Sequence, residues 1–203
     1  MFQTTPESRP IQPARIRLRQ LTIALPVLAW LIGAALFLRA DGSIDWPLQR
    51  TSQPPESVHN LALYQWGPTL RASSYFRGAL SQHHPIFLVD ARDAPGEVEK
   101  WTSGVHDRQP WTEILWREPR RLERVVIRHA GTREAAQLTI RRYRLACLLE
   151  AGREGPAVSV TQNTESVATH PLACERARGV RVEWTANDPG DQVRVYEIEA
   201  WGR

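Results

Sequence analysis

Cysteine and lysine are scarce in this sequence. Two cysteines in 203 residues exclude a disulfide-dense miniature scaffold and a four-cysteine zinc site. Of the 26 basic residues, only Lys100 is a lysine. The six histidines show neither the H-E-x-x-H spacing nor a Cys-His spacing of a zinc site. With 42% hydrophobic and 24% charged residues, the composition is that of a globular chain with a sizeable core.

Motifs of catalysis are also missing. The sequence contains no G-x-S-x-G turn, no phosphate-binding P-loop and no G-x-G-x-x-G turn. Two pairs of glutamates are close enough in sequence to suggest acid–base work, Glu97 with Glu99 and Glu197 with Glu199, but neither pair has a partner motif. The sequence therefore predicts a protein that is not an enzyme.

No excess of charge falls on the larger part of the chain. Residues 1–40 hold five arginines and one acidic residue, whereas residues 41–203 hold 21 basic and 21 acidic residues. A nucleic-acid-binding protein normally carries its positive excess on the folded domain. We therefore expect no nucleic-acid partner.

A single long hydrophobic run is present. Residues 21–38 contain no charged residue, and as a helix they would span about 27 Å, enough for the core of a bilayer. Arg15, Arg17 and Arg19 precede the run, and positive flanks stay on the cytoplasmic side. We expect residues 1–20 to be a basic cytoplasmic N-terminus and the run to be a single-pass transmembrane helix that acts as a signal anchor.

The segment 39–60 is rich in proline, serine, glutamine and aspartate, which predicts a linker. Residues 61–203 would then lie in the periplasm or outside the cell. A cleaved signal peptide is the alternative, with a cut after Ala40. That cut would leave the location unchanged, but Leu38 stands where such sites have a small residue.

Residues 61–203 show the two-residue alternation of strands and no long helical periodicity. Segments with alternating or β-branched residues are found at 111–116, 121–128, 137–149, 157–161, 179–184 and 192–201. Proline and glycine turn signals separate them. Short strands at this spacing predict an all-β jelly-roll β-sandwich, with Trp111 and Trp184 at core positions.

Five short motifs follow one another in a recognisable order. They are Ala72-Ser73-Ser74, Val89-Asp90, Trp101-Thr102-Ser103, Pro110–Ile114 and Tyr196–Gly202. In this order they resemble the discoidin, or coagulation-factor type C, domain of the galactose-binding-like superfamily. The resemblance runs from about residue 61 to the C-terminus. After Asp90 the sequence departs from the family pattern, because Ala91 stands in place of glycine.

The resemblance implies a binding module that presents loops to a ligand, and we expect envelope or extracellular carbohydrate. Rings and charged groups in or beside the early loops are the candidate contacts: Trp66, Tyr75, Phe76, Arg77, His83, His84 and Arg92. Ordinary packing of these side chains is the alternative. The alternative function is an accessory or structural subunit that docks on a membrane-protein partner, such as an envelope glycan-assembly enzyme.

Many sugar-binding members of the family hold a structural calcium ion. By position, Asp90, Asp93 and Glu197 match its carboxylate ligands. Calcium takes about six to eight oxygens, some of them from the backbone of a tight loop, and the loop glycine is missing here. The alternative is that Asp90 caps a turn and Glu197 pairs with an arginine. No other cofactor is predicted.

The resemblance also bears on the two cysteines. In discoidin-like sandwiches the regions that hold Cys147 and Cys174 approach each other in space. The predicted compartment is oxidising, and cysteines there are more often paired than free. We expect a disulfide between them, and two separate buried thiols are the alternative.

Overall fold

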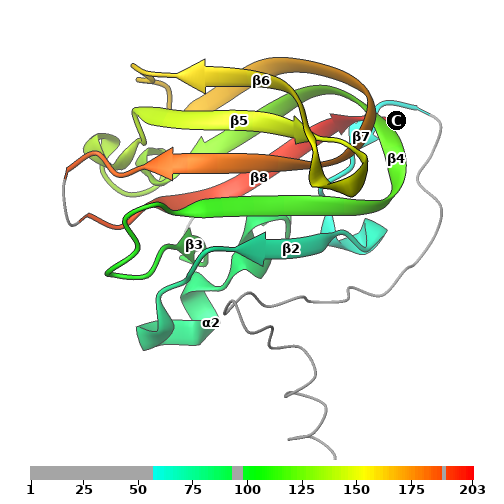
Figure 1. The fold of residues 1–203 in the computed structure, drawn as a ribbon. Helices are drawn as coiled ribbons and strands as arrows, with labels where there is room; N and C mark the ends of the chain where they lie inside the picture. Colours follow the sequence, from blue (N-terminus) through cyan, green and yellow to red (C-terminus); the bar gives the residue numbers. More distant parts are fainter. Residues whose placement is uncertain (1–56, 93–97, 189–190) are drawn as a thin grey trace, which may run out of the picture. The chain divides into compact units, whose positions relative to one another are not determined.

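The computed structural model describes residues 57–92, 98–188 and 191–203, which are coloured in Figure 1. The predicted cytoplasmic segment, the predicted transmembrane helix and most of the predicted linker lie outside the described residues, as does Asp93. Within the described ranges, no helix is both long and apolar enough to cross a bilayer.

Eight strands form the part of the domain that the structure describes, and all their pairings are antiparallel. The strands are β1 (His59–Asn60), β2 (Thr69–Ala72), β3 (Trp101–Thr102), β4 (Trp111–His129), β5 (Arg142–Leu148), β6 (Glu154–Val160), β7 (Val167–Thr185) and β8 (Arg194–Gly202). Helical elements are short: η1 (Tyr64–Trp66), η2 (Arg77–Ala79), α2 (Leu80–His83), η3 (Pro85–Leu88), η4 (Ala130–Thr132), η5 (Ala136–Leu138) and η6 (Glu150–Gly152). The all-β prediction is confirmed.

Strands β4 and β7 are long and bend from one layer of a sandwich into the other (Figure 1). The first part of β4 pairs with β2 and with the end of β7, whereas its second part pairs with β8 and with the start of β7. Register shifts between Leu115 and Arg124 mark the bend. The front layer in Figure 1 therefore has the order β2-β4-β7-β5-β6, and in the back layer β8 lies between β4 and the short strands β1 and β3.

The hydrophobic core lies between the two layers. Alternate residues of the strands point into it, because side chains of a strand alternate between its two faces. Its most deeply buried members include Leu70, Ile114, Leu122, Val125, Ile127, Leu145, Val180, Val182 and Ile198. Burial of each such side chain stabilises the fold by about 1.5–3 kcal/mol, so the core holds the two layers together.

The two tryptophans predicted for the core have different positions. Trp184 is buried, with 3% of its surface exposed, and its Nε1 donates a hydrogen bond to Thr112 Oγ1 at 3.1 Å. Because Thr112 points into the core, its neighbour Trp111 points outward. The prediction for Trp111 is wrong: its ring is half-buried on the outer face, with the Arg181 guanidinium 4.5 Å from the ring centroid.

A continuous row of ion pairs crosses the outer face of the front layer. We call it the ion-pair ladder, and its members in strand order are Arg71, Glu113, Arg181, Glu183, Arg144 and Glu154. Successive N–O distances are 3.4, 2.7, 3.2, 3.7 and 2.5 Å. The flat fork of a guanidinium can donate to carboxylates on two sides, which suits arginine better than lysine to such a row.

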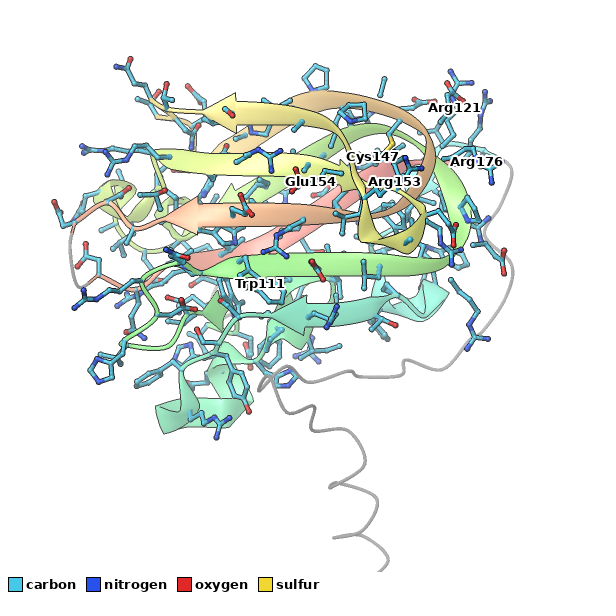
Figure 2. All side chains as sticks on the ribbon, in the orientation of Figure 1. Trp111, Arg121, Cys147, Arg153, Glu154 and Arg176 are labelled. Atoms are coloured by element: carbon cyan, nitrogen blue, oxygen red, sulfur yellow. A yellow bond between two sulfur atoms is a disulfide. The ribbon has the colours of Figure 1, made fainter. Side chains whose placement is uncertain are left out.

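The predicted disulfide is confirmed. Cys147 and Cys174 are bonded, and their Cα atoms lie 6.6 Å apart. Cys147 lies opposite Val180 in the front layer, whereas Cys174 lies opposite Leu122 in the back layer. The bond therefore ties β5 to the bend of the long strand β7 (Figure 2).

Three boundaries differ from the sequence expectation. The folded part includes β1, whose two residues, His59 and Asn60, lie in the predicted linker and pair with β8. The segment predicted to be extended over 137–149 becomes a strand only at Arg142, because residues 136–138 form a 3-10 turn. The strand predicted at 179–184 is the second half of β7, which begins at Val167.

Candidate ligand-binding site

One end of the sandwich is built from connections between strands. Strand β5 begins there, β6 and the second half of β7 end there, and β8 begins there, on the side opposite the C-terminus (Figure 1). The described connections that meet at this end are residues 130–141, 161–166, 186–188 and 191–193. Loops held by a rigid framework are where ligand sites commonly lie.

A cavity of about 510 Å³ opens at this end. Its lining is entirely polar in residue type: Arg141, Arg142, Thr161, Gln162, Asn163, Thr164 and Asn187. The volume falls in the range of sites for small ligands, which is about 300–1,000 Å³. Guanidinium, amide and hydroxyl groups can donate and accept hydrogen bonds, so the cavity suits a ligand that is rich in hydroxyl or charged oxygen groups.

The side chain of Asn187 fixes one wall of the cavity. Its Oδ1 accepts a hydrogen bond from the backbone N–H of Arg141 at 3.0 Å. Its Nδ2 donates to the carbonyls of Gln137 and Thr139 at 3.0 and 2.9 Å. The start of the β7–β8 connection is thereby fastened to the segment that leads into β5.

Asn163 fixes the opposite wall. Its Nδ2 donates to the carbonyls of Ile140 and Glu165, each at 3.0 Å, and its backbone N–H donates to the Arg141 carbonyl at 2.9 Å. The backbone of Arg141 is thus bonded on both sides, to Asn163 and Asn187. A wall held in this way loses little conformational freedom when a ligand binds.

A buried aromatic cluster contacts Asn163 on the core side. The His129 ring is fully buried, its Nε2 lies 3.3 Å from Asn163 Nδ2, and burial lowers its pKa to about 4. The ring is therefore neutral at pH 7. Beside it, the Tyr143 hydroxyl is 2.6 Å from His170 Nε2, and burial raises the pKa of Tyr143.

Five of the seven predicted ligand contacts come together, but none of them lines this cavity. Tyr75 and His84 pack edge to face with ring centroids 5.4 Å apart, and Phe76 and His83 do the same at 5.4 Å. The guanidinium of Arg77 lies 5.4 Å from the Tyr75 ring.

Burial is the largest cause that lowers the pKa of both histidines of this cluster. His83 Nδ1 is 3.0 Å from Thr102 Oγ1, and His84 Nδ1 accepts the Ile86 N–H at 3.2 Å. The four rings are half-buried and contact one another, and the two histidines also contact the chain. Arg77 is exposed and remains available.

Trp66 and Arg92 lie apart from that cluster. Trp66 precedes β2 and packs against His59 at 5.5 Å, and its buried Nε1 has no hydrogen-bond partner among the described residues. Arg92 is exposed, and its Nε is 3.8 Å from an Asp90 carboxylate oxygen. Of the seven predicted ligand contacts, only those between residues 75 and 84 therefore lie together.

Two of the predicted metal ligands, Asp90 and Glu197, do approach each other. The N–H of Ala91 donates to Glu197 Oε1 at 3.3 Å, and the N–H of Arg92 donates to Asp90 Oδ1 at 3.2 Å. Glu197 Oε2 is buried with no partner among the described residues. Burial, then the nearby Asp90 charge, raise the pKa of Glu197 to about 9.

A cation beside the buried, unsatisfied carboxyl oxygen of Glu197 would offset both its burial and its repulsion by Asp90. Asp90 and Glu197 therefore fit the calcium position that the resemblance implies. Ala91, which stands in place of glycine, has a φ of 56°, in the left-handed region that favours glycine. The described residues contain no group of three or more side chains of His, Cys, Asp or Glu placed for a metal. Of the two alternative contacts, the turn cap at Asp90 is present. For the arginine pair, the ion pair seen beside Glu197 is that of Arg128 with Glu199, at 2.9 Å.

The cavity residues were not predicted from the sequence. They come from the start of β5 and the residue before it, the β6–β7 connection and the start of the β7–β8 connection, and no motif joins them. Two local signals were present: the adjacent arginines Arg141 and Arg142, and the polar run from Thr161 to Thr164 between two strands.

No family model and no curated relative matches the chain in sequence. The fold is similar to a fucose-binding module from Streptococcus pneumoniae, with a TM-score of 0.58 and 15% identity over 74% of this chain and 100% of that one. It is also similar to the family 32 carbohydrate-binding module of Streptococcus pneumoniae EndoD, with a TM-score of 0.55 and 19% identity over 71% of this chain and 100% of that one.

A third similar structure is chitosan-binding module 1 from a chitosanase/glucanase of Paenibacillus sp. IK-5. Its TM-score is 0.55, with 20% identity over 71% of this chain and 99% of that one. These likenesses show that the chain has the discoidin, or galactose-binding-like, β-sandwich fold, as the order of its short motifs indicated.

Proposed function

We propose that this protein is a membrane-anchored, extracytoplasmic carbohydrate-binding module. The observation that carries the proposal is the sugar-sized polar cavity at the loop end of the sandwich. Support comes from similar structures that are described as fucose-binding and chitosan-binding modules. Because one fold can serve unrelated functions, the chemistry of the cavity has to carry the argument.

That chemistry suits a sugar. The hydroxyls of Thr161 and Thr164 and the amide of Gln162 can each donate and accept, which matches the dual character of sugar hydroxyls. The guanidinium groups add strong directional donors. Since Asn163 and Asn187 fix the walls, these groups are held in place before the ligand arrives.

The anchor is the other half of the proposal. Residues 21–38 would hold the sandwich at the outer side of the membrane, with Arg15–Arg19 in the cytoplasm. The disulfide supports this location, because such bonds persist in oxidising compartments. In sealed vesicles, the sandwich should resist a protease added to the cytoplasmic side, and digestion there would overturn the proposed topology.

A glycan array with the full chain in detergent tests the binding proposal. We expect binding to a subset of glycans that weakens about tenfold or more in Gln162→Ala and Thr164→Ala, which remove exposed lining groups. Thr169→Ala is the matched control, because Thr169 is exposed on β7 and does not line the cavity.

Two other results would redirect the assignment. Loss of binding in Arg77→Ala, with the cavity variants unaffected, would move the site to the Tyr75 cluster. If no glycan binds and a membrane protein copurifies from detergent extracts, the accessory-subunit alternative would replace the carbohydrate proposal.

A further inference from the structure

The two arginines of the cavity differ from those of the ion-pair ladder. Arg142 and Arg144 lie two residues apart on β5, so their side chains emerge on the same face of the strand. Arg144 is bonded to Glu154 and Glu183 on the flanking strands. Arg142 instead lies opposite Thr185 of β7.

Neither cavity arginine has a carboxylate partner. Within the described residues, Arg141 and Arg142 form no ion pair, and both side chains are exposed. None of the described residues that line the cavity is an aspartate or a glutamate. Two adjacent positive charges therefore face the cavity without a compensating negative charge from its walls.

The cavity also lacks a feature that neutral sugars commonly need. The described lining residues include no aromatic side chain, so they offer no ring to lie against the apolar face of a pyranose. Guanidinium groups pair best with planar or tetrahedral oxyanions, to which they donate two parallel hydrogen bonds. The strongest interaction that this cavity can offer is with a negatively charged group.

We propose that the cavity binds an anionic carbohydrate, in which a carboxylate or sulfate group is held by Arg141 and Arg142 while Thr161, Gln162 and Thr164 contact the hydroxyls. This inference rests on the proposed carbohydrate-binding function and names the class of its ligand. Both arginines line the cavity, and the backbone of Arg141 is held by Asn163 and Asn187.

The test uses the full chain in detergent and two matched pairs of polymers. Polygalacturonate is compared with its fully methyl-esterified form, and dextran sulfate with dextran. We expect each charged polymer to bind at least about tenfold more tightly than its neutral match, with the difference shrinking as salt is raised. The stronger of the two charged polymers tells a carboxylate ligand from a sulfate ligand.

Arg142→Gln should weaken binding of the preferred charged polymer about tenfold and leave the midpoint of urea unfolding unchanged. The control is Arg153→Gln, which removes the same charge from an exposed arginine of the β5–β6 connection (Figure 2). That connection lies at the other end of β5 from the cavity.

The two proposals fail in different ways. Equal affinity for charged and neutral polymers, or an equal loss in Arg153→Gln, would overturn the anionic ligand and leave a neutral carbohydrate as the ligand. Absence of binding to these polymers and to every glycan of the array would overturn the carbohydrate-binding function itself.

Discussion

The ion-pair ladder and the loop-end cavity use the same residue type for opposite purposes. In the ladder, three arginines face three glutamates across five strands, and the charges cancel locally. In the cavity, Arg141 and Arg142 face threonine, glutamine and asparagine. The net charge of zero over residues 41–203 therefore hides a surface that is balanced in one region and positive in the other.

This difference shows that whether an arginine forms an ion pair depends on the residues of the neighbouring strands. Arg142 and Arg144 share a strand, a face and a charge, yet only Arg144 has glutamates on both flanking strands. A paired arginine contributes to stability, whereas an arginine without a carboxylate partner is free to contribute to ligand binding. Variants can test this division region by region.

The largest effect is expected from the disulfide, which ties β5, the strand common to both regions, to β7. Replacing Cys147 and Cys174 by alanine should lower the free energy of unfolding by about 3–4 kcal/mol, because the bond closes a loop across 27 positions. Urea unfolding with and without reductant measures it. Reductant should destabilise the wild type and leave the double variant unaffected, and coinciding midpoints would contradict the prediction.

Acid should weaken the support of the cavity before it weakens the ladder. His129 has a pKa of about 4 in the fold against 6.5 in the unfolded chain, so the unfolded state binds more protons between these values. Stability contributed by the neutral ring should be lost as the pH falls from 6.5 to about 4. The full difference corresponds to about 3 kcal/mol.

Glu197 acts in the opposite direction, since its raised pKa favours the folded state at low pH and this advantage is lost as the pH rises from 4.5 to about 9. The measurement is therefore made in a Glu197→Gln background. In the ladder, the hydrogen bond to Arg144 lowers the pKa of Glu154, so its contribution is complete above pH 4.5 and is lost only as the pH falls below that value. A flat stability profile between pH 6.5 and 4.5 would argue against the His129 prediction.

A smaller effect is expected at the most buried rung of the ladder. Only 9% of the Glu113 side chain is exposed, and it accepts from Arg71 at 3.4 Å and Arg181 at 2.7 Å. Glu113→Gln should lower the free energy of unfolding by about 1–3 kcal/mol, because two guanidiniums lose the carboxylate charge that both of them pair with. Glu175→Gln is the control: this carboxylate is 76% exposed, and its loss should stay within about 0.5 kcal/mol.

The smallest effects separate the two arginines of β5. Arg144→Gln should cost about 0.5–1 kcal/mol, in the range of exposed ion pairs, and high salt should reduce the difference. Arg142→Gln should change the unfolding free energy by less than about 0.5 kcal/mol. Urea unfolding of both variants checks the comparison, and a larger loss for Arg142→Gln would show that this arginine has a structural role.

Much of the fold could be predicted from local patterns. Two-residue alternation at 111–116 and 121–128 located both parts of β4, although their union into one bent strand depends on pairing with β2, β7 and β8. The first half of β7 was missed because Pro171 and scattered polar residues interrupt its alternation. Its pairing with β4 overrides that weak local signal.

The candidate site was predicted less well. Tyr75, Phe76 and Arg77 are adjacent in sequence, and the short turn of η2 and α2 returns the chain to His83 and His84. Such a local cluster can be read from the sequence. The cavity cannot be read in this way, because its walls come from connections that meet only after β5, β6 and β7 have paired.

By itself, the sequence determined the strand-rich character of residues 61–203, the order of the discoidin-like motifs and the presence of two cysteines to be joined. The strand-rich character follows from periodicity, which acts over a few residues, whereas the pairing of the cysteines is what the resemblance to the discoidin domain implies. Only the tertiary structure decided that Trp111 faces outward, that Arg144 is paired and that Arg142 opens onto a cavity. The reason is physical: an arginine's partners lie on flanking strands, and their register is set by long-range pairing and burial of the core.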